Sequence, residues 1–325
     1  RLVLLSLCWV SLAKPGYFFG KYLRRLPYAL TLNNSLELIE PNDRVLIIQN
    51  GYFGLRMENM CQRLGADISL LKFDWGQPVD ANEVEAHLKN NIYDAIAIVH
   101  AETSTGVQNS VKEISRFIPD NTIFIVDAVT SLGTIDIQVD NWSIDAIYSC
   151  SQKGLSCPPG ASPISFSEKA LNKMKRRQKM VPNWYLDMTE IIKYWDGNQR
   201  VYHHTAPINM MYALYQSLYD VLEEGIDNVI QRHYNSHLLL EKGLSELGLE
   251  LLVKKDARLP SLNAVKIPEG VNDLDVRNKL LNEYHIEIGG GLGPFAGKVW
   301  RIGLMGYSAR EENISKLLNA LGQVL

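Results

Sequence analysis

The sequence has few cysteines, and their spacing excludes two classes of site. Only four occur in 325 residues, namely Cys8, Cys61, Cys150 and Cys157. A zinc ribbon needs closely paired cysteines, and the disulfide framework of a secreted domain needs a much higher cysteine density. We therefore predict no metal site and a reducing, cytoplasmic location. Cys150 and Cys157 are expected to be small buried side chains.

A large excess of either sign of charge is also lacking. The formal net charge at pH 7 is -3, so no overall positive field favours nucleic acid. The densest basic run, KMKRRQK at 173–179, is predicted to be a solvated helix face. We therefore predict that nucleic acid is not a partner.

The apolar run near the start is too short to span a membrane, so no membrane association is predicted. This segment, RLVLLSLCWVSLAKPG at residues 1–16, resembles a secretory signal that would be cleaved after Ala13. The interpretation that we favour is different. We expect residues 1–34 to be an atypical segment, truncated or foreign to the fold.

Short β-branched runs alternate with segments of helical spacing from about residue 42. Predicted strands lie at 44–50, 67–73, 94–101, 122–129 and 144–150. Predicted helices lie at 52–65, 80–91 and 110–119. This alternation, with continuously apolar strands, predicts an α/β domain whose largely parallel sheet is covered on both faces.

The C-terminal part has a different pattern. A long helical stretch is predicted over 208–248, and His233 and His237 are expected on its exposed surface. Shorter elements follow it, with strands at 261–268, 286–291 and 298–304 and helices at 272–284 and 310–324. We predict a large domain at 35–235 and a smaller α+β domain at 236–325.

Polar residues gather where the predicted strands end, which is where open α/β sheets bind ligands. Asp127 ends one strand, and Lys153 follows the next. A lysine more often pairs with an acid or reaches water. In a desolvated site it can instead form an imine with a carbonyl, most often that of pyridoxal phosphate, whose ring nitrogen needs a carboxylate. Asp127 would supply the carboxylate, and Phe53 or Tyr52 an aromatic face.

Several segments carry a more specific signal. In chain order they are GYFGLR, HAETSTG, VDAVTSLG, YSCSQKGLSCPPGASPISFS, NWYLDM, VYHHTAPIN and IEIGGGLGPFAGKVWRIGLMG. Together they resemble the class V pyridoxal-phosphate aminotransferases, and within them the alanine–glyoxylate (serine–pyruvate) group. The resemblance runs from about residue 35 to the C-terminus. It implies the fold type I architecture and ping-pong transfer of an amino group from alanine or serine to glyoxylate or pyruvate.

The resemblance also implies roles for residues around the cofactor ring. Lys153 would form the Schiff base with the cofactor and carry a proton to and from the substrate. Asp127 would bind the pyridinium nitrogen. Phe53 would stack on one ring face, where many relatives have Trp, and Val129 would pack on the other. Ser104 would hydrogen-bond the region of the ring hydroxyl.

Further roles concern the phosphate and the substrate. Gln152 would reach the cofactor phosphate. Tyr202 and Thr205 would reach the phosphate bound by the neighbouring subunit, which implies a homodimer. Arg301 would bind the substrate carboxylate as a two-pronged fork, a geometry that lysine cannot reproduce.

The sequence departs from the family upstream of residue 44. The family has a Gly-rich turn there that cradles the phosphate, but residues 17–34 read YFFGKYLRRLPYALTLNN. This departure is the reason for expecting residues 1–34 to be foreign to the fold. Two alternatives stay open. One is the same cofactor with another substrate, of kynurenine type or in a desulfurase-like reaction. The other is a non-catalytic homologue that lacks the phosphate turn.

Overall fold

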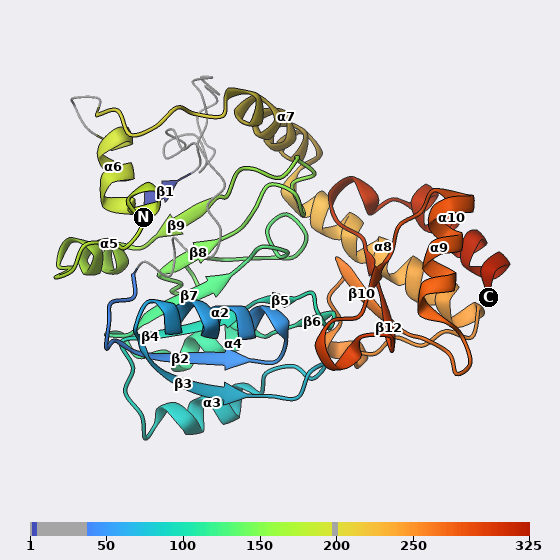
Figure 1. Cartoon of the computed structure of the whole chain (residues 1–325), viewed down its shortest axis with the longest axis horizontal. Helices are drawn as coiled ribbons and strands as arrows, with labels where there is room; N and C mark the ends of the chain where they lie inside the picture. The colour runs from blue at the N-terminus through green and yellow to red at the C-terminus, as the bar shows by residue number, and fades with distance from the viewer. Residues whose placement is uncertain (1, 5–37, 197–200) are drawn as a thin grey trace.

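The computed structural model describes residues 2–4, 38–196 and 201–325 (Figure 1). The predictions for residues 1–34, including the signal peptide and the missing Gly-rich turn, therefore lie almost wholly outside the described residues. Figure 1 shows the two regular parts of the chain, a large sheet with its helices and, beside it, a smaller sheet packed with the C-terminal helices.

The large sheet has seven strands in the order β1-β9-β8-β7-β4-β2-β3. Its parallel strands are β2 (Arg44–Gln49), β3 (Asp67–Lys72), β4 (Ala95–Val99), β7 (Ile123–Asp127) and β8 (Ala146–Tyr148). Two antiparallel strands, β9 (Ile164–Phe166) and β1 (Leu2–Leu4), extend one edge. The five strands predicted from the apolar runs are thus confirmed, as is the α/β class with a mostly parallel sheet.

Both faces of this sheet are buried, which explains why its strands are continuously apolar. Val45 and Ile47 of β2 pack into one core cluster, whereas Leu46 and Ile48 pack into another. Successive side chains of a strand point to opposite faces, so each face needs its own cover. The helices that follow the strands are α2 (Tyr52–Arg63), α3 (Ala81–Leu88), the short α4 (Val111–Ile114), α5 (Glu168–Lys175) and α6 (Met188–Asp196).

The smaller sheet is antiparallel, with the order β10-β12-β11. Its strands are β10 (Leu262–Lys266), β11 (Gly289–Gly290) and β12 (Val299–Gly303). It shares a hydrophobic core with α9 (Asp273–Tyr284), α10 (Glu311–Val324) and the second half of α8 (Ile226–Glu246). The predicted boundary between residues 235 and 236 falls inside α8, and the exact division stays a prediction.

The predicted stretch at 208–248 is helical but divided in two, and the predicted exposure of its histidines is wrong. The stretch is two helices, α7 (Ile208–Glu224) and α8 (Ile226–Glu246). They meet at Gly225, whose φ of 87° lies outside the helical region. His233 and His237 are buried because both contact the C-terminal part of the chain, where His237 Nδ1 lies 2.6 Å from Asn263 Oδ1 of β10. His233 accepts a hydrogen bond at Nε2 from the Gly306 amide, at 2.9 Å.

Within the described ranges, no helix is long and apolar enough to cross a membrane.

Candidate active site

The carboxyl ends of β2, β4, β7 and β8 lie side by side at one edge of the large sheet. The chain leaves β4 through a short hairpin of β5 (Ala101–Glu102) and β6 (Val107–Gln108), whose turn carries Thr103 and Ser104. Most of this hairpin is formed by the HAETSTG segment at 100–106, one of the segments that carry the family resemblance. The edge therefore collects the side chains that the sequence placed in separate motifs.

Asp127 is the last residue of β7, and its carboxylate is held at both oxygens. The Val129 amide donates to Oδ1 at 2.8 Å, and the Tyr148 hydroxyl donates to Oδ2 at 2.7 Å. Tyr148 stands directly opposite Asp127 in the β7–β8 register. Burial raises the pKa of Asp127 to about 6, and the hydrogen bonds oppose this. Between described residues, no ion pair includes Asp127.

Lys153 is half-buried in the loop that follows β8. Its carbonyl accepts the Ser156 amide at 3.1 Å, so the loop turns back directly after the lysine. Glycine is required at position 154 by a close approach to the segment after β7, because a Cβ there would lie 2.2 Å from the Leu132 carbonyl oxygen. The small residue and the turn after Lys153 thus let the loop pack tightly against the segment that follows β7.

The thiol of Cys150 is influenced by the charges of both Lys153 and Asp127. Burial raises the pKa of Cys150 to about 11, the charge of Lys153 lowers it, and the charge of Asp127 raises it. Both charged groups are therefore within electrostatic range of the same side chain. Cys150 and Cys157 are free and buried, as predicted.

Phe53 lies in the first turn of α2, which begins directly after β2. Its ring is half-buried, meets the Tyr52 ring edge-on at 5.9 Å, and has the Arg56 guanidinium 4.9 Å from its centre. The charge of Arg56 also lowers the pKa of Asp127. An aromatic ring thus lies near the buried carboxylate, although sequence analysis did not select Arg56.

Ser104 is buried in the hairpin turn and has two polar contacts. Its hydroxyl donates to Glu102 Oε1 at 2.6 Å and accepts the Tyr52 amide at 2.9 Å. Ser104 is therefore linked through both contacts to the same edge as Phe53. Val129 is half-buried against the core beside Asp127, and Gln152 is exposed next to Lys153.

Arg301 lies on β12 of the smaller sheet and reaches across to the hairpin. Its Nε donates to the Gly290 carbonyl at 2.8 Å, and one terminal nitrogen donates to the Thr103 carbonyl at 3.2 Å. Burial lowers the pKa of Arg301, and the negative charge of Glu102 opposes this. These bonds fix the plane of the guanidinium beside the turn that carries Ser104.

Tyr202 and Thr205 lie apart from this edge in the chain, on the segment before α7. The Tyr202 hydroxyl is 2.9 Å from Thr205 Oγ1, and the Tyr202 side chain is 70% exposed. The structure thus pairs these two predicted residues with each other, at the protein surface.

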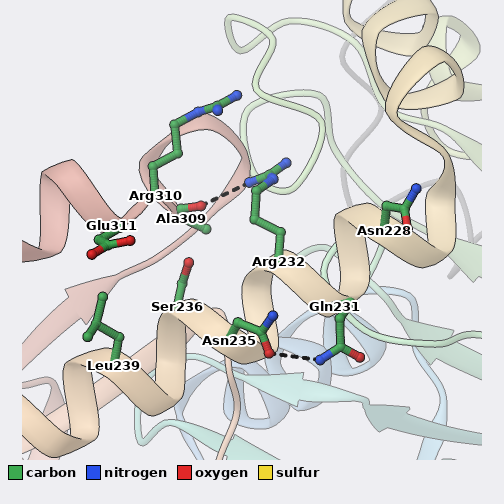
Figure 2. A pocket seen from close by; sticks show the side chains of 9 residues that line it. All are labelled: Asn228, Gln231, Arg232, Asn235, Ser236, Leu239, Ala309, Arg310 and Glu311. Atoms are coloured by element: carbon green, nitrogen blue, oxygen red, sulfur yellow. Dashed lines mark hydrogen bonds between the residues drawn. The ribbon is translucent and has the colours of Figure 1, made fainter.

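A separate hollow lies between α8 and the start of α10. It has a volume of 510 Å³, and Figure 2 shows its polar lining, with Arg232 donating to the Ala309 carbonyl and Gln231 bonded to Asn235. None of the predicted site residues lines it. It is therefore distinct from the sheet edge.

The sequence pattern of the family Aminotransferase class-V matches residues 28–317. The chain is therefore a class V aminotransferase. It is 38% identical over 293 residues to alanine–glyoxylate aminotransferase of Mus musculus, covering 89% of this chain and 71% of the relative. It is 35% identical over 308 residues to (S)-ureidoglycine–glyoxylate transaminase of Bacillus subtilis, covering 89% of this chain and 74% of the relative.

A solved structure gives the same result for this class V aminotransferase. Alanine–glyoxylate aminotransferase from Nostoc sp. superposes with a TM-score of 0.87 at 46% identity, covering 90% of this chain and 78% of the other. The resemblance to the family and the fold type I architecture are thus confirmed. The cofactor of this aminotransferase is pyridoxal 5'-phosphate, and its substrates are amino and 2-oxo acids.

The residues present fit this cofactor. A buried carboxylate such as that of Asp127 is costly unless a cation or hydrogen bonds compensate it, and the cofactor's ring nitrogen supplies a cation. Sequence analysis missed Glu102 and Tyr148. Glu102 lies inside the HAETSTG motif, and Tyr148 ends β8 after the two apolar residues Ala146 and Ile147, a position that sequence analysis did not single out.

Proposed function

We propose that this class V aminotransferase transfers the amino group of a small amino acid, alanine or serine, to glyoxylate or pyruvate. The small donors and acceptors are suggested by the similarity to alanine–glyoxylate aminotransferases, and the observation that carries the amino-acid and 2-oxo-acid part is the placement of Arg301. Its guanidinium is held by two carbonyls beside the hairpin at the sheet edge, where it offers a planar fork to one carboxylate. An α-amino acid and a 2-oxo acid each carry such a carboxylate.

The chemistry of transfer belongs to the cofactor, which supplies an aldehyde for the amino group and a ring that withdraws electrons. Lys153 holds the cofactor and moves a proton at the substrate α-carbon. Asp127 keeps the ring nitrogen protonated. Its buried position strengthens this interaction, because a low-dielectric surrounding weakens the charge less than water does.

The remaining predicted residues orient the cofactor. Phe53 and Val129 would enclose the ring, and Ser104 would face the ring hydroxyl. Gln152 would reach the phosphate. Ser104 already donates its proton to Glu102, so it would act toward the cofactor as a hydrogen-bond acceptor.

We further propose a homodimer in which Tyr202 and Thr205 reach the phosphate bound by the partner subunit. Large apolar side chains are exposed on the neighbouring helix α7, where a second copy would cover them, namely Ile208, Tyr212, Tyr219 and Leu222. We also infer a cytoplasmic location, which suits three free buried cysteines.

(S)-Ureidoglycine is a second candidate donor, favoured by the relative from Bacillus subtilis, whose acceptor is also glyoxylate. A substrate panel separates the candidates. The purified protein is assayed with alanine, serine, (S)-ureidoglycine, kynurenine and cysteine as donors, and with glyoxylate and pyruvate as acceptors. Alanine or serine with glyoxylate is expected to be fastest, and a preference for another donor would refute the proposed substrates.

Cofactor binding is tested separately by titration with pyridoxal phosphate. We expect visible absorbance that shifts on addition of alanine and that is lost in Lys153→Ala, while the far-ultraviolet circular dichroism stays unchanged. A folded protein that does not take up the cofactor would instead support the non-catalytic alternative.

A further inference from the structure

Glu102 is a fully buried carboxylate at the candidate site to which the function proposed above gives no role. It is the last residue of β5, with an exposed fraction of 0%. Four donors surround its carboxylate. Oε2 accepts the amides of Phe53 at 3.1 Å and Gly54 at 3.3 Å. Oε1 accepts the Ser104 amide at 3.1 Å and the Ser104 hydroxyl at 2.6 Å.

The bonds to Oε2 come from the first turn of α2. The amides at the start of a helix have no partner within the helix, and a carboxylate is favoured there by the helix dipole. No side chain at the preceding position, Gly51, caps this helix. A Cβ on Gly51 would lie 2.4 Å from Glu102 Cδ, so the glycine makes room for the carboxylate. Glu102 thus caps the start of α2 although it lies on β5, which is not the strand that precedes this helix.

The bonds to Oε1 fix the hairpin turn, and this turn contacts Arg301, the residue proposed to bind the substrate carboxylate. Thr103 lies between Glu102 and Ser104 in the chain, and its carbonyl accepts a hydrogen bond from the Arg301 guanidinium. The amides of Thr105 and Gly106 donate to the Glu102 carbonyl at 3.2 and 2.9 Å, which closes the turn. One side chain therefore connects the start of α2 with the turn that holds Arg301.

Electrostatics point the same way. Burial raises the pKa of Glu102 to about 7, the hydrogen bonds from Ser104 and Gly54 oppose this, and the charge of Asp127 adds to the rise. The charge of Glu102 raises the pKa of Arg301. A carboxylate that costs this much to bury, and that bonds both to the helix carrying Phe53 and to the turn that contacts Arg301, is better explained by the site than by packing alone.

Building on the roles assigned under the proposed function, we propose that Glu102 is a positioning residue of the transamination site. It holds the start of α2, with the Phe53 ring, at a fixed position relative to the turn that carries Ser104 and contacts Arg301. It does not touch the reacting atoms. It sets the distance between the ring-binding groups and the group that binds the substrate carboxylate.

Glu102→Gln tests this proposal because it keeps the size of the side chain and changes its bonding. One carboxylate oxygen becomes an NH₂ group, which is itself a donor. It then faces either the two α2 amides or the two Ser104 donors and can accept from neither pair. Glu58→Gln is the matched control. Glu58 lies on the same helix and is half-buried, and it also accepts a side-chain hydrogen bond, from Gln49 at 3.1 Å.

Three measurements follow on the full chain. We expect Glu102→Gln to bind pyridoxal phosphate about tenfold more weakly by absorbance titration, a factor that corresponds to one good hydrogen bond. The visible circular dichroism per bound cofactor should fall, because the ring is less firmly oriented. At saturating cofactor, the KM for the amino donor should rise several-fold.

The sign of the KM change is diagnostic. Removing the negative charge near Arg301 would by itself strengthen carboxylate binding and lower KM, whereas loss of positioning raises it. An unchanged cofactor affinity and dichroism, or a lowered KM, would overturn the proposal. Glu58→Gln should match the wild type in all three.

If Glu102→Gln does not fold, Glu102→Asp takes its place, because it keeps the charge and withdraws the carboxylate from the α2 amides. The same changes are expected there, and wild-type behaviour of Glu102→Asp would equally refute the proposal. The wild-type titration separates this inference from the proposed function. A wild-type protein that does not bind the cofactor refutes the function, whereas equal binding by wild type and variant refutes only the role of Glu102.

Discussion

Replacing Asp127 with asparagine is expected to stabilise the cofactor-free protein at pH 8 while it weakens cofactor binding. Burial raises the pKa of Asp127 from 3.8 to about 6. The folded protein thus holds this proton more tightly than the unfolded chain does. Stability is therefore lost as the pH rises from about 4 through about 6, and the loss is complete above that range.

The size of the effect follows from the shift. About two pKa units, at 1.36 kcal/mol each, correspond to roughly 3 kcal/mol of destabilisation of the wild type at pH 8. Asparagine does not titrate, and it can keep both contacts. Its oxygen can accept the Val129 amide, and its NH₂ can donate to the Tyr148 hydroxyl, which is able to accept. A cost of up to about 1 kcal/mol for altered hydrogen bonds leaves a net gain of about 2 kcal/mol.

The assay is urea unfolding of the cofactor-free wild type and Asp127→Asn at pH 5 and pH 8. The variant should have the higher midpoint at pH 8, and the difference should shrink toward pH 5. Glu102 titrates in both proteins, so its contribution largely cancels. Asp145→Asn is the control, since its buried carboxylate is paired with Lys169 at 2.7 Å and its replacement should destabilise the protein at pH 8.

Cofactor affinity should change in the opposite direction. Losing a charge-assisted contact to the ring nitrogen is worth about 1.5–3 kcal/mol, or about a 10- to 100-fold rise in the dissociation constant. An Asp127→Asn protein that is less stable than the wild type by the same amount at both pH values would refute the account of Asp127 as a costly, ligand-directed carboxylate.

Three further substitutions probe the surroundings. Arg301→Lys should raise the KM for the amino donor about 10- to 100-fold in steady-state assays without changing the absorbance of bound cofactor, because lysine cannot form the fork; a collapse of the absorbance would contradict this. Gly154→Ala should lower the free energy of unfolding by about 1–3 kcal/mol, since its Cβ meets the Leu132 carbonyl; an unchanged urea midpoint would refute the packing argument. Tyr148→Phe removes a donor from Asp127 and so raises its pKa further; cofactor titrations should show a larger loss of affinity at pH 6 than at pH 9.

The fold was predictable from the sequence where burial alone dictates the pattern. The apolar runs of β2, β4 and β7 could be recognised because both of their faces are covered. The break at Gly225 was missed, because helical spacing continues on both sides and a single glycine does not reveal its φ. The buried histidines of α8 were missed for a related reason, since their contacts with Asn263 and Gly306 are tertiary and leave no local pattern.

The site was predictable only in part. Asp127 and Lys153 stand out as charged residues at the ends of apolar strands, and Arg301 was placed by resemblance. The contact between Asp127 and Tyr148 depends on the β7–β8 register, which single motifs do not encode. Most of the bonds to Glu102 come from backbone amides, which every residue but proline possesses, so no sequence pattern distinguishes them.

The bond between Arg301 and the Thr103 carbonyl joins residues 198 positions apart. The large sheet carries the groups proposed to hold the cofactor, whereas the fork for the substrate carboxylate comes from a strand near the end of the chain. On this proposal, binding of the substrate carboxylate and retention of the cofactor depend on separable stretches of the gene. Disrupting the stretch around β12 would weaken the binding of every donor while the colour of the holoenzyme persists.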